Sequence, residues 1–131
     1  MAIPSGAGTE VLRRNSIFNQ STTLTNIDWA QSAQTAAGNS SGTIAVPAEA
    51  IITVLNIVWC NRHASSRTLD LIIANSSGSV VDIQILDTQS IATLQTFVFS
   101  DKLVLREGDQ LQFDMSSDNV DVYLDYIYQA F

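Results

Sequence analysis

The stretch Ile-Ile-Thr-Val-Leu-Asn-Ile-Val-Trp-Cys-Asn at residues 51–61 decides the fold class. It is rich in β-branched and aromatic residues, follows Pro47 and runs into a polar segment, which is typical of a β-strand. Its odd positions, which include Ile57 and Trp59, and its even positions are both mainly apolar, with Asn56 as the polar exception. A strand that is apolar on both faces belongs inside a sandwich or beneath a partner subunit.

Shorter alternating segments lie on both sides of this stretch. Downstream, apolar and polar residues alternate between turn residues, as expected of antiparallel strands; these segments are 69–74, 81–85, 93–100, 103–105, 111–115 and 120–128. Upstream, residues 10–18 predict a first strand, and residues 44–46 predict a short one that ends at Pro47. The turn 106–109 contains Gly108, which can supply a positive φ. The pattern predicts an all-β, antiparallel, jelly-roll-like β-sandwich.

The 131 residues suit one domain with three parts. Residues 1–18 comprise an extended N-terminal arm, with Pro4 among small residues, and the first strand. Residues 19–42 form a polar loop or insertion. Within it, Asp-Trp-Ala-Gln at 28–31 matches a capping box, so a short helix ending near Gly38 and a structured loop both remain open. Residues 43–131 form the core of the sandwich.

The charge balance excludes two classes of partner. The chain carries a net charge of −7 with six basic residues, whereas nucleic acids and anionic membranes need clustered Lys and Arg. No stretch approaches the ~20 apolar residues of a membrane span, and the start lacks the pattern of a secretory signal. We therefore expect no nucleic acid and no membrane partner, and synthesis in a cytoplasm. The acids concentrate after residue 100, which predicts a solvated acidic face or one that meets a basic partner.

The titratable residues do not form a catalytic pattern. Cys60, the one cysteine, is three residues from His63, so on a strand their side chains would point to opposite faces. Asp121 and Asp125 would share a strand face about 13 Å apart, too far for a glycosidase pair. We predict no enzyme, no cofactor and no metal site, and His63 in a solvated loop with nothing nearby to orient it. Calcium at the oxygen-rich residues 116–119 remains an open alternative.

Three segments carry a resemblance to known proteins. The opening Met-Ala-Ile-Pro-Ser-Gly-Ala-Gly-Thr-Glu-Val-Leu-Arg-Arg, residues 53–61 and residues 95–102 resemble small virion structural proteins of tailed bacteriophages, especially cyanophages and other marine phages. With the Gly108-Asp109 turn, the likeness covers residues 1–18 and 43–131, and residues 20–42 look like an insertion. The resemblance implies a capsid decoration or cement protein on the virion surface. Its partners would be the major capsid protein and itself, as a homotrimer.

Six residues are candidates for contacts with the capsid or with another subunit. An arm with Ile3, Pro4, Val11 and the pair Arg13-Arg14 is suited to adding a strand to a neighbouring sheet edge. Tyr123 shares a predicted strand face with two aspartates, and an aromatic residue on a polar face is typical of an interface core.

The alternative is a tail, neck or fibre component that binds host glycan. In such a protein, Trp29 or Tyr123 would stack on the sugar.

Overall fold

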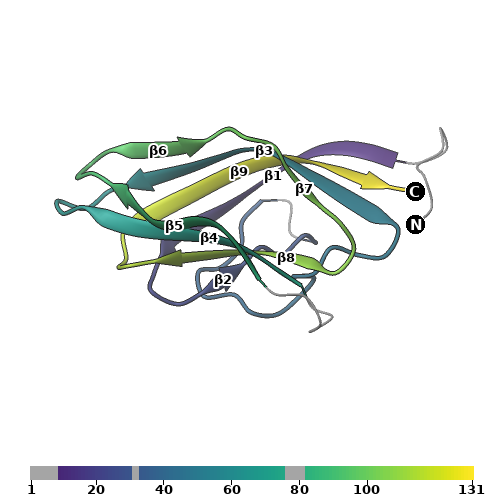
Figure 1. The fold of residues 1–131 in the computed structure, drawn as a ribbon, viewed down its shortest axis with the longest axis horizontal. Helices are drawn as coiled ribbons and strands as arrows, with labels where there is room; N and C mark the ends of the chain where they lie inside the picture. Colours follow the sequence, from purple (N-terminus) through teal and green to yellow (C-terminus); the bar gives the residue numbers. More distant parts are fainter. Residues whose placement is uncertain (1–8, 31–32, 76–81) are drawn as a thin grey trace.

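The computed structural model describes residues 9–30, 33–75 and 82–131, and these form a sandwich of two antiparallel sheets (Figure 1). The strands are β1 (Thr9–Gln20), β2 (Thr25–Asn26), β3 (Ala50–Asn61), β4 (Arg67–Asn75), β5 (Ile83–Ile91), β6 (Thr96–Phe99), β7 (Leu103–Leu105), β8 (Asp109–Met115) and β9 (Val120–Ala130). Within the described residues there is no helix. The all-β prediction is confirmed.

The strands wind as a jelly roll. One sheet, here called sheet A, has the order β1-β9-β3-β6, with β7 also paired to β3, and the other, sheet B, has the order β2-β8-β4-β5. Early strands pair with late ones in a nested way: β1 with β9, β2 with β8, β3 with β6 and β7, and β4 with β5. This winding, with the pairs alternating between two sheets, confirms the predicted jelly-roll-like sandwich.

Aromatic side chains fill the space between the sheets. Trp59 of β3 is fully buried, and its ring centroid lies 5.8 Å from that of Phe97 and 5.9 Å from that of Phe113. Because Phe113 belongs to sheet B, Trp59 links the two layers. Trp29 packs edge-on against Tyr126 at 5.1 Å. Along β8 and most of β9, alternate residues are buried, among them Phe113 and Tyr126.

A β-bulge in β3 corrects one prediction. The register between β3 and β9 shifts between Val54 and Asn56. An extra residue in one strand resets its alternation. The buried side chains are therefore Ile52 and Val54 before the shift, and Ile57 and Trp59 after it. The expectation that Ile57 and Trp59 share a face with all the other odd positions of residues 51–61 is thus wrong.

Residues 19 and 20 end β1, and the described part of the rest of this segment, 21–30 and 33–42, forms a structured loop with the short strand β2 and no helix. The Asp28 carboxylate accepts hydrogen bonds from the backbone N–H groups of Ala30 (3.0 Å) and Thr43 (3.2 Å). It also lies against Gly42, whose φ of +83° and lack of a side chain permit this approach. Asp28, the first residue of the capping-box pattern, therefore holds the two ends of a loop together and does not start a helix.

A buried Gln20 holds the other end of this loop. Its Nε2 donates to the backbone carbonyls of Ser21, Thr23 and Phe113, and its Oε1 accepts from the Thr25 hydroxyl at 2.6 Å. The predicted strand at residues 44–46 is reduced to one bridge, between Ala45 and Gln110.

Candidate interaction surface

The side of sheet A that faces away from sheet B carries rows of apolar side chains. In one row, Leu12, Ile127, Thr53 and Val104 lie in register across β1, β9, β3 and β7. We call this side the outer face of sheet A and define it by residues Leu12, Arg14, Ser16, Phe18, Ile51, Thr53, Val58, Cys60, Thr96, Val98, Val104, Asp121, Tyr123, Asp125 and Ile127.

A second row lies on the same face. Ser16, Tyr123, Val58 and Val98 are in register across β1, β9, β3 and β6. Between the two rows, Arg14 lies opposite Asp125. The outer face of sheet A therefore consists of two largely apolar rows separated by a charged pair.

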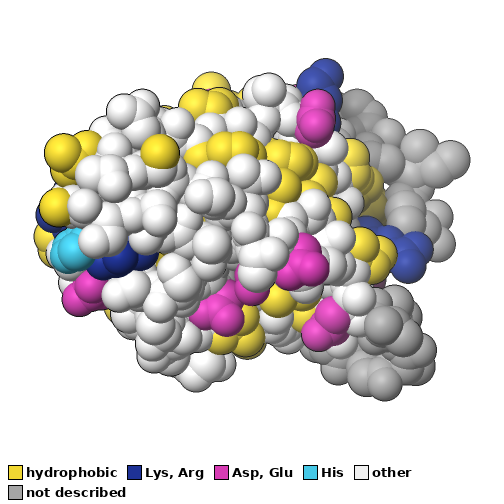
Figure 2. All heavy atoms as spheres, turned by 60° about the vertical axis from the view of Figure 1, so that its left-hand side comes forward, with side chains coloured by type: hydrophobic (Ala, Val, Ile, Leu, Met, Phe, Trp, Pro, Cys, Tyr) yellow, Lys and Arg dark blue, Asp and Glu magenta, His cyan; other side chains and the backbone are white. Residues whose placement is uncertain are grey.

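The exposed large apolar residues gather on this face. Among the described residues nine such side chains are exposed, and five of them belong to the outer face of sheet A: Leu12 (70%), Phe18 (60%), Val98 (52%), Val104 (66%) and Tyr123 (40%). Single exposed apolar residues are ordinary on soluble proteins, but a contiguous group marks an interaction surface. In Figure 2, exposed hydrophobic side chains gather in a band across the upper part of the molecule, and most acidic side chains lie below it.

A hollow of about 300 Å³ lies on this face between Phe18 and Tyr123. Its lining residues are Ser16, Ile17, Phe18, Gln34, Val58, Cys60, Asp121, Val122 and Tyr123. Arg62 borders it: the guanidinium lies 5.2 Å from the centre of the Phe18 ring, and its Nε is 2.8 Å from Asp121 Oδ2. Asp121 Oδ1 accepts a hydrogen bond from the Asn19 backbone at 2.9 Å. The rim of the hollow is thus held in place by one arginine–aspartate pair.

The two outer faces of the sandwich differ in charge. On sheet A, both arginines, Arg14 and Arg62, lie beside a carboxylate. On the outer face of sheet B, Asp70 and Asp114 are directly opposite each other in the register of β4 and β8. Like charges at such a position repel. Each of these carboxylates accepts a backbone hydrogen bond, from Thr88 and Met115 respectively, which offsets part of that repulsion.

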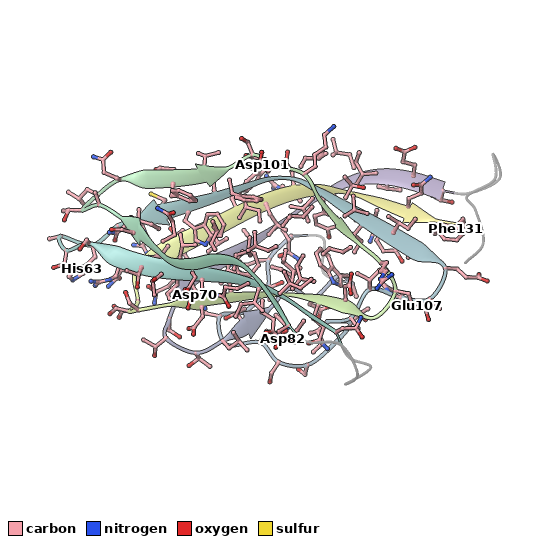
Figure 3. All side chains as sticks on the ribbon, viewed as in Figure 1. His63, Asp70, Asp82, Asp101, Glu107 and Phe131 are labelled. Carbon is pink, nitrogen blue, oxygen red and sulfur yellow. The ribbon has the colours of Figure 1, made fainter. Side chains whose placement is uncertain are left out.

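The titratable side chains do not converge on a catalytic centre. Cys60 lines the hollow on sheet A, whereas His63 lies in the loop after β3, where its Nδ1 accepts a hydrogen bond from the Ser65 backbone at 3.1 Å. The expectation that nothing nearby orients His63 is therefore wrong. Figure 3 shows His63 at one end of the sandwich and Glu107 near the other. Within residues 9–30, 33–75 and 82–131, no three His, Cys, Asp or Glu side chains are grouped to hold a metal ion.

The candidate contact residues fall on two faces. Arg14 and Tyr123 belong to the outer face of sheet A. Val11 and Arg13 have the opposite parity on β1, and the Arg13 guanidinium lies 4.2 Å from the centre of the Tyr128 ring. All three β1 residues pair with β9, so they belong to the sheet and not to a free arm. Ile3 and Pro4 lie outside the described residues.

Burial removes one candidate for glycan stacking. Trp29 is 1% exposed, so no sugar can reach its ring. Sequence reasoning missed the exposed residues Leu12, Phe18, Val98 and Val104. On β1 a signal was present, because Leu12 and Phe18 share parity with Arg14 and Ser16, which marks large apolar side chains on a polar face. Val98 and Val104 become part of this face only through their pairing with β3.

No protein-family model matches the sequence, and no curated protein matches it. Among solved structures, the chain is similar to the infectious bursal disease virus VP2 subviral particle (TM-score 0.45, 11% identity) and to the Gx strain of that virus (0.47, 8%). In both cases 97% of this chain aligns with 33% of the viral chain. It is also similar to Eiger TNF from S. frugiperda (0.38, 12%, 91% of both chains). The chain thus spans about a third of the viral chains, and the likeness concerns the fold alone.

In the described part of the chain, no helix is long and apolar enough to span a membrane.

Proposed function

We propose that this chain is a non-enzymatic structural protein of a bacteriophage virion. In this proposal it is a decoration or cement protein that binds the major capsid protein as a homotrimer on the capsid surface, after synthesis in the host cytoplasm. One observation carries the proposal: the sandwich has a complete core, yet it leaves an apolar face exposed on sheet A. Such a face is what a protein needs when it acts by contact with other subunits.

The segments that resemble phage virion proteins support this reading by their position. Residues 53–61 lie in β3, residues 95–102 include β6, and the described end of the N-terminal segment lies in β1. All three strands belong to sheet A, and β3 pairs directly with β6. These three segments therefore lie on the sheet that carries the exposed apolar face, whereas the Gly108-Asp109 turn leads into β8 of sheet B.

We assign the capsid contact to the N-terminal segment with Ile3 and Pro4 and to the adjoining β1 residues Val11, Arg13 and Arg14. The chain has few basic residues, and Arg13 and Arg14 place two of them next to this segment. A peptide segment can bind a neighbouring protein by adding a strand to a sheet edge, and we propose this mode for the N-terminal segment.

Binding to purified, expanded phage capsids tests the proposed function. Sedimentation with capsids should saturate at a fixed ratio to the major capsid protein. Deletion of residues 1–8 should weaken the apparent Kd by about tenfold or more, or about 1.4 kcal/mol. The deletion stops at residue 8 because residues 9–14 pair with β9, and their loss would damage sheet A.

Two results would count against the proposal. Full binding by the chain that lacks residues 1–8 would remove the anchoring role of the N-terminal segment. Failure of the intact protein to bind capsids in a saturable way would remove the capsid function itself.

A second candidate function has one observation in its favour. The hollow between Phe18 and Tyr123 combines two aromatic rings with the polar groups of Asp121 and Gln34, which is a suitable lining for a small polar ligand. A tail or fibre component that binds host glycan would use it. Saturable binding on a glycan array that is lost in Tyr123→Ala would favour this function, and an array without such binding would exclude it.

A further inference from the structure

We infer that the outer face of sheet A is the surface through which this chain binds a second copy of itself. The inference rests on the proposed function, which includes a homo-oligomer, and it adds the face that the copies use. It follows from the composition of this face, from its area and from its charge. It also follows from the poor fit of the other molecules or segments that could cover the face.

The composition favours a protein partner. Each of the two apolar rows crosses four strands, and the rows include Leu12 and Val104 in one case and Tyr123 and Val98 in the other. Leu12, Val104, Tyr123 and Val98 are 40–70% exposed, so water contacts much of their apolar surface in a single chain, whereas Ile127 and Val58 in the same rows are partly buried. A second protein surface would remove these side chains from water, and the gain grows with the apolar area that is covered.

The area of the face is sufficient for a specific interface. Four strand positions at about 4.8 Å give a width of roughly 19 Å, and the length of β9 at about 3.3 Å per residue gives roughly 33 Å. The face therefore offers about 600 Å² per copy and about 1,200 Å² for a pair. That is the lower end of the range for specific protein–protein interfaces.

Charge favours a copy of the same chain over other partners. The outer face, with its neighbours Glu10 and Arg62, carries three acids and two arginines, so only about one of the seven net negative charges lies there. Copies that meet through sheet A avoid bringing Asp70 and Asp114 of sheet B together. A nucleic acid or an anionic membrane would need clustered basic groups, whereas this face has only Arg14, opposite Asp125 in the register, and the neighbouring Arg62, which pairs with Asp121.

The chain's own N-terminal segment is a poor cover for this face. Residues 1–8 contain only Met1, Ile3 and Pro4 as larger apolar residues, the others being Ala, Ser and Gly. Three such side chains cannot cover two rows that each cross four strands. A second copy supplies apolar rows of equal size, and in the proposed homotrimer one part of this face would contact a different part of the next copy, because contacts around a three-fold axis are heterologous.

The first test is the mass of the protein in solution by sedimentation velocity. Leu12→Glu/Val98→Glu introduces one charge into each apolar row, at two exposed positions. The control is Leu24→Glu, because Leu24 lies next to β2 of sheet B, is 36% exposed and does not belong to the outer face of sheet A. The intact protein should form a defined oligomer, the double variant should associate about a hundredfold more weakly, and the control should match the intact protein.

The second test needs no substitution. Cys60 is the single cysteine and lies half-buried on the outer face, so a maleimide reagent reports whether that face is covered. Labelling of the intact protein should slow by about tenfold as protein concentration rises through the association range, whereas the folded double variant should stay fast. A monomeric intact protein, or a labelling rate that is independent of concentration in an oligomer, would overturn the inference.

These results separate the inference from the proposed function. A chain that associates through sheet A but does not bind capsids leaves the inference standing and removes the function. An oligomer that binds capsids in a saturable way, with Cys60 still open to the reagent, removes the inference and leaves the function standing.

Discussion

Replacement of Trp59 is the most direct probe of the jelly-roll core. Its side chain is fully buried and contacts the rings of Phe97 and Phe113, so it joins β3 and β6 of sheet A to β8 of sheet B. Trp→Ala at such a site costs about 3–5 kcal/mol because the cavity cannot close fully. A domain of this size has about 5–15 kcal/mol of unfolding free energy, so Trp59→Ala should lose a large part of it.

Trp59→Phe separates the effect of the buried indole N–H on stability from the effect of the lost ring volume. The Trp59 Nε1 is buried and has no hydrogen-bond partner among the described residues. An unsatisfied buried donor costs about 1–3 kcal/mol, and phenylalanine removes it while it retains an aromatic ring between Phe97 and Phe113. We therefore expect Trp59→Phe to cost only about 1–2 kcal/mol, since the relieved donor offsets much of the lost packing.

Urea unfolding of the intact protein and both variants, followed by far-UV circular dichroism, measures these differences. The m-values should be equal, so that shifts in midpoint report stability. If Trp59→Ala and Trp59→Phe destabilise the protein equally, the buried N–H of Trp59 does not lower the stability of the intact protein. A loss of less than about 1 kcal/mol for Trp59→Ala would refute the role of Trp59 as the link between the sheets.

Three further substitutions test the loop 19–42 and the buried Tyr126 of β9. Gln20→Ala removes four hydrogen bonds from a buried site and should cost about 2–4 kcal/mol in urea unfolding, and a loss below about 1 kcal/mol would contradict its role as an anchor. Gly42→Ala places a methyl group against the Asp28 carboxylate at a positive φ, so it should cost more than about 1 kcal/mol, and a neutral result in the same assay would contradict this close approach. Burial raises the pKa of Tyr126 above its ordinary 10.0, although the Arg13 guanidinium opposes this. Because the folded protein then holds the proton more tightly, stability should fall as pH rises above about 10, and Tyr126→Phe should fall less in unfolding measured across that range.

Alternation along the strands is the part of the fold that sequence reasoning captures well. In β8 and β9 the apolar set is unbroken and a single core lies on one side, so the buried residues follow directly from the pattern. In β3 both the odd-numbered and the even-numbered residues are mainly apolar. The bulge near Asn56 changes which of these two sets is buried: the even-numbered residues before it and the odd-numbered residues after it. Periodicity carries no information about such a bulge, because side chains on both parities are equally suited to burial.

The interaction surface is predictable only in part, because it depends on which strands become neighbours. Tyr123 is visible from the sequence as an aromatic residue between two aspartates, and Arg14 is visible in the basic pair. Val98 and Val104 lie on short strands whose place beside β3 follows from long-range pairing. In the loop 19–42, Asp28 has the sequence of a helix start, but its carboxylate accepts a hydrogen bond from the Thr43 backbone, 15 residues downstream, and packs against Gly42. Local sequence could not reveal those contacts.

The central claim is that this protein is a structural part of a phage particle. Quantitative mass spectrometry of purified, nuclease-treated virus particles from a host culture that produces the chain tests this claim most directly, with capsid and tail fractions analysed separately. The account predicts that the chain is present in the capsid fraction at a fixed ratio to the major capsid protein. Its absence from purified particles, while it accumulates in infected cells, would contradict the account.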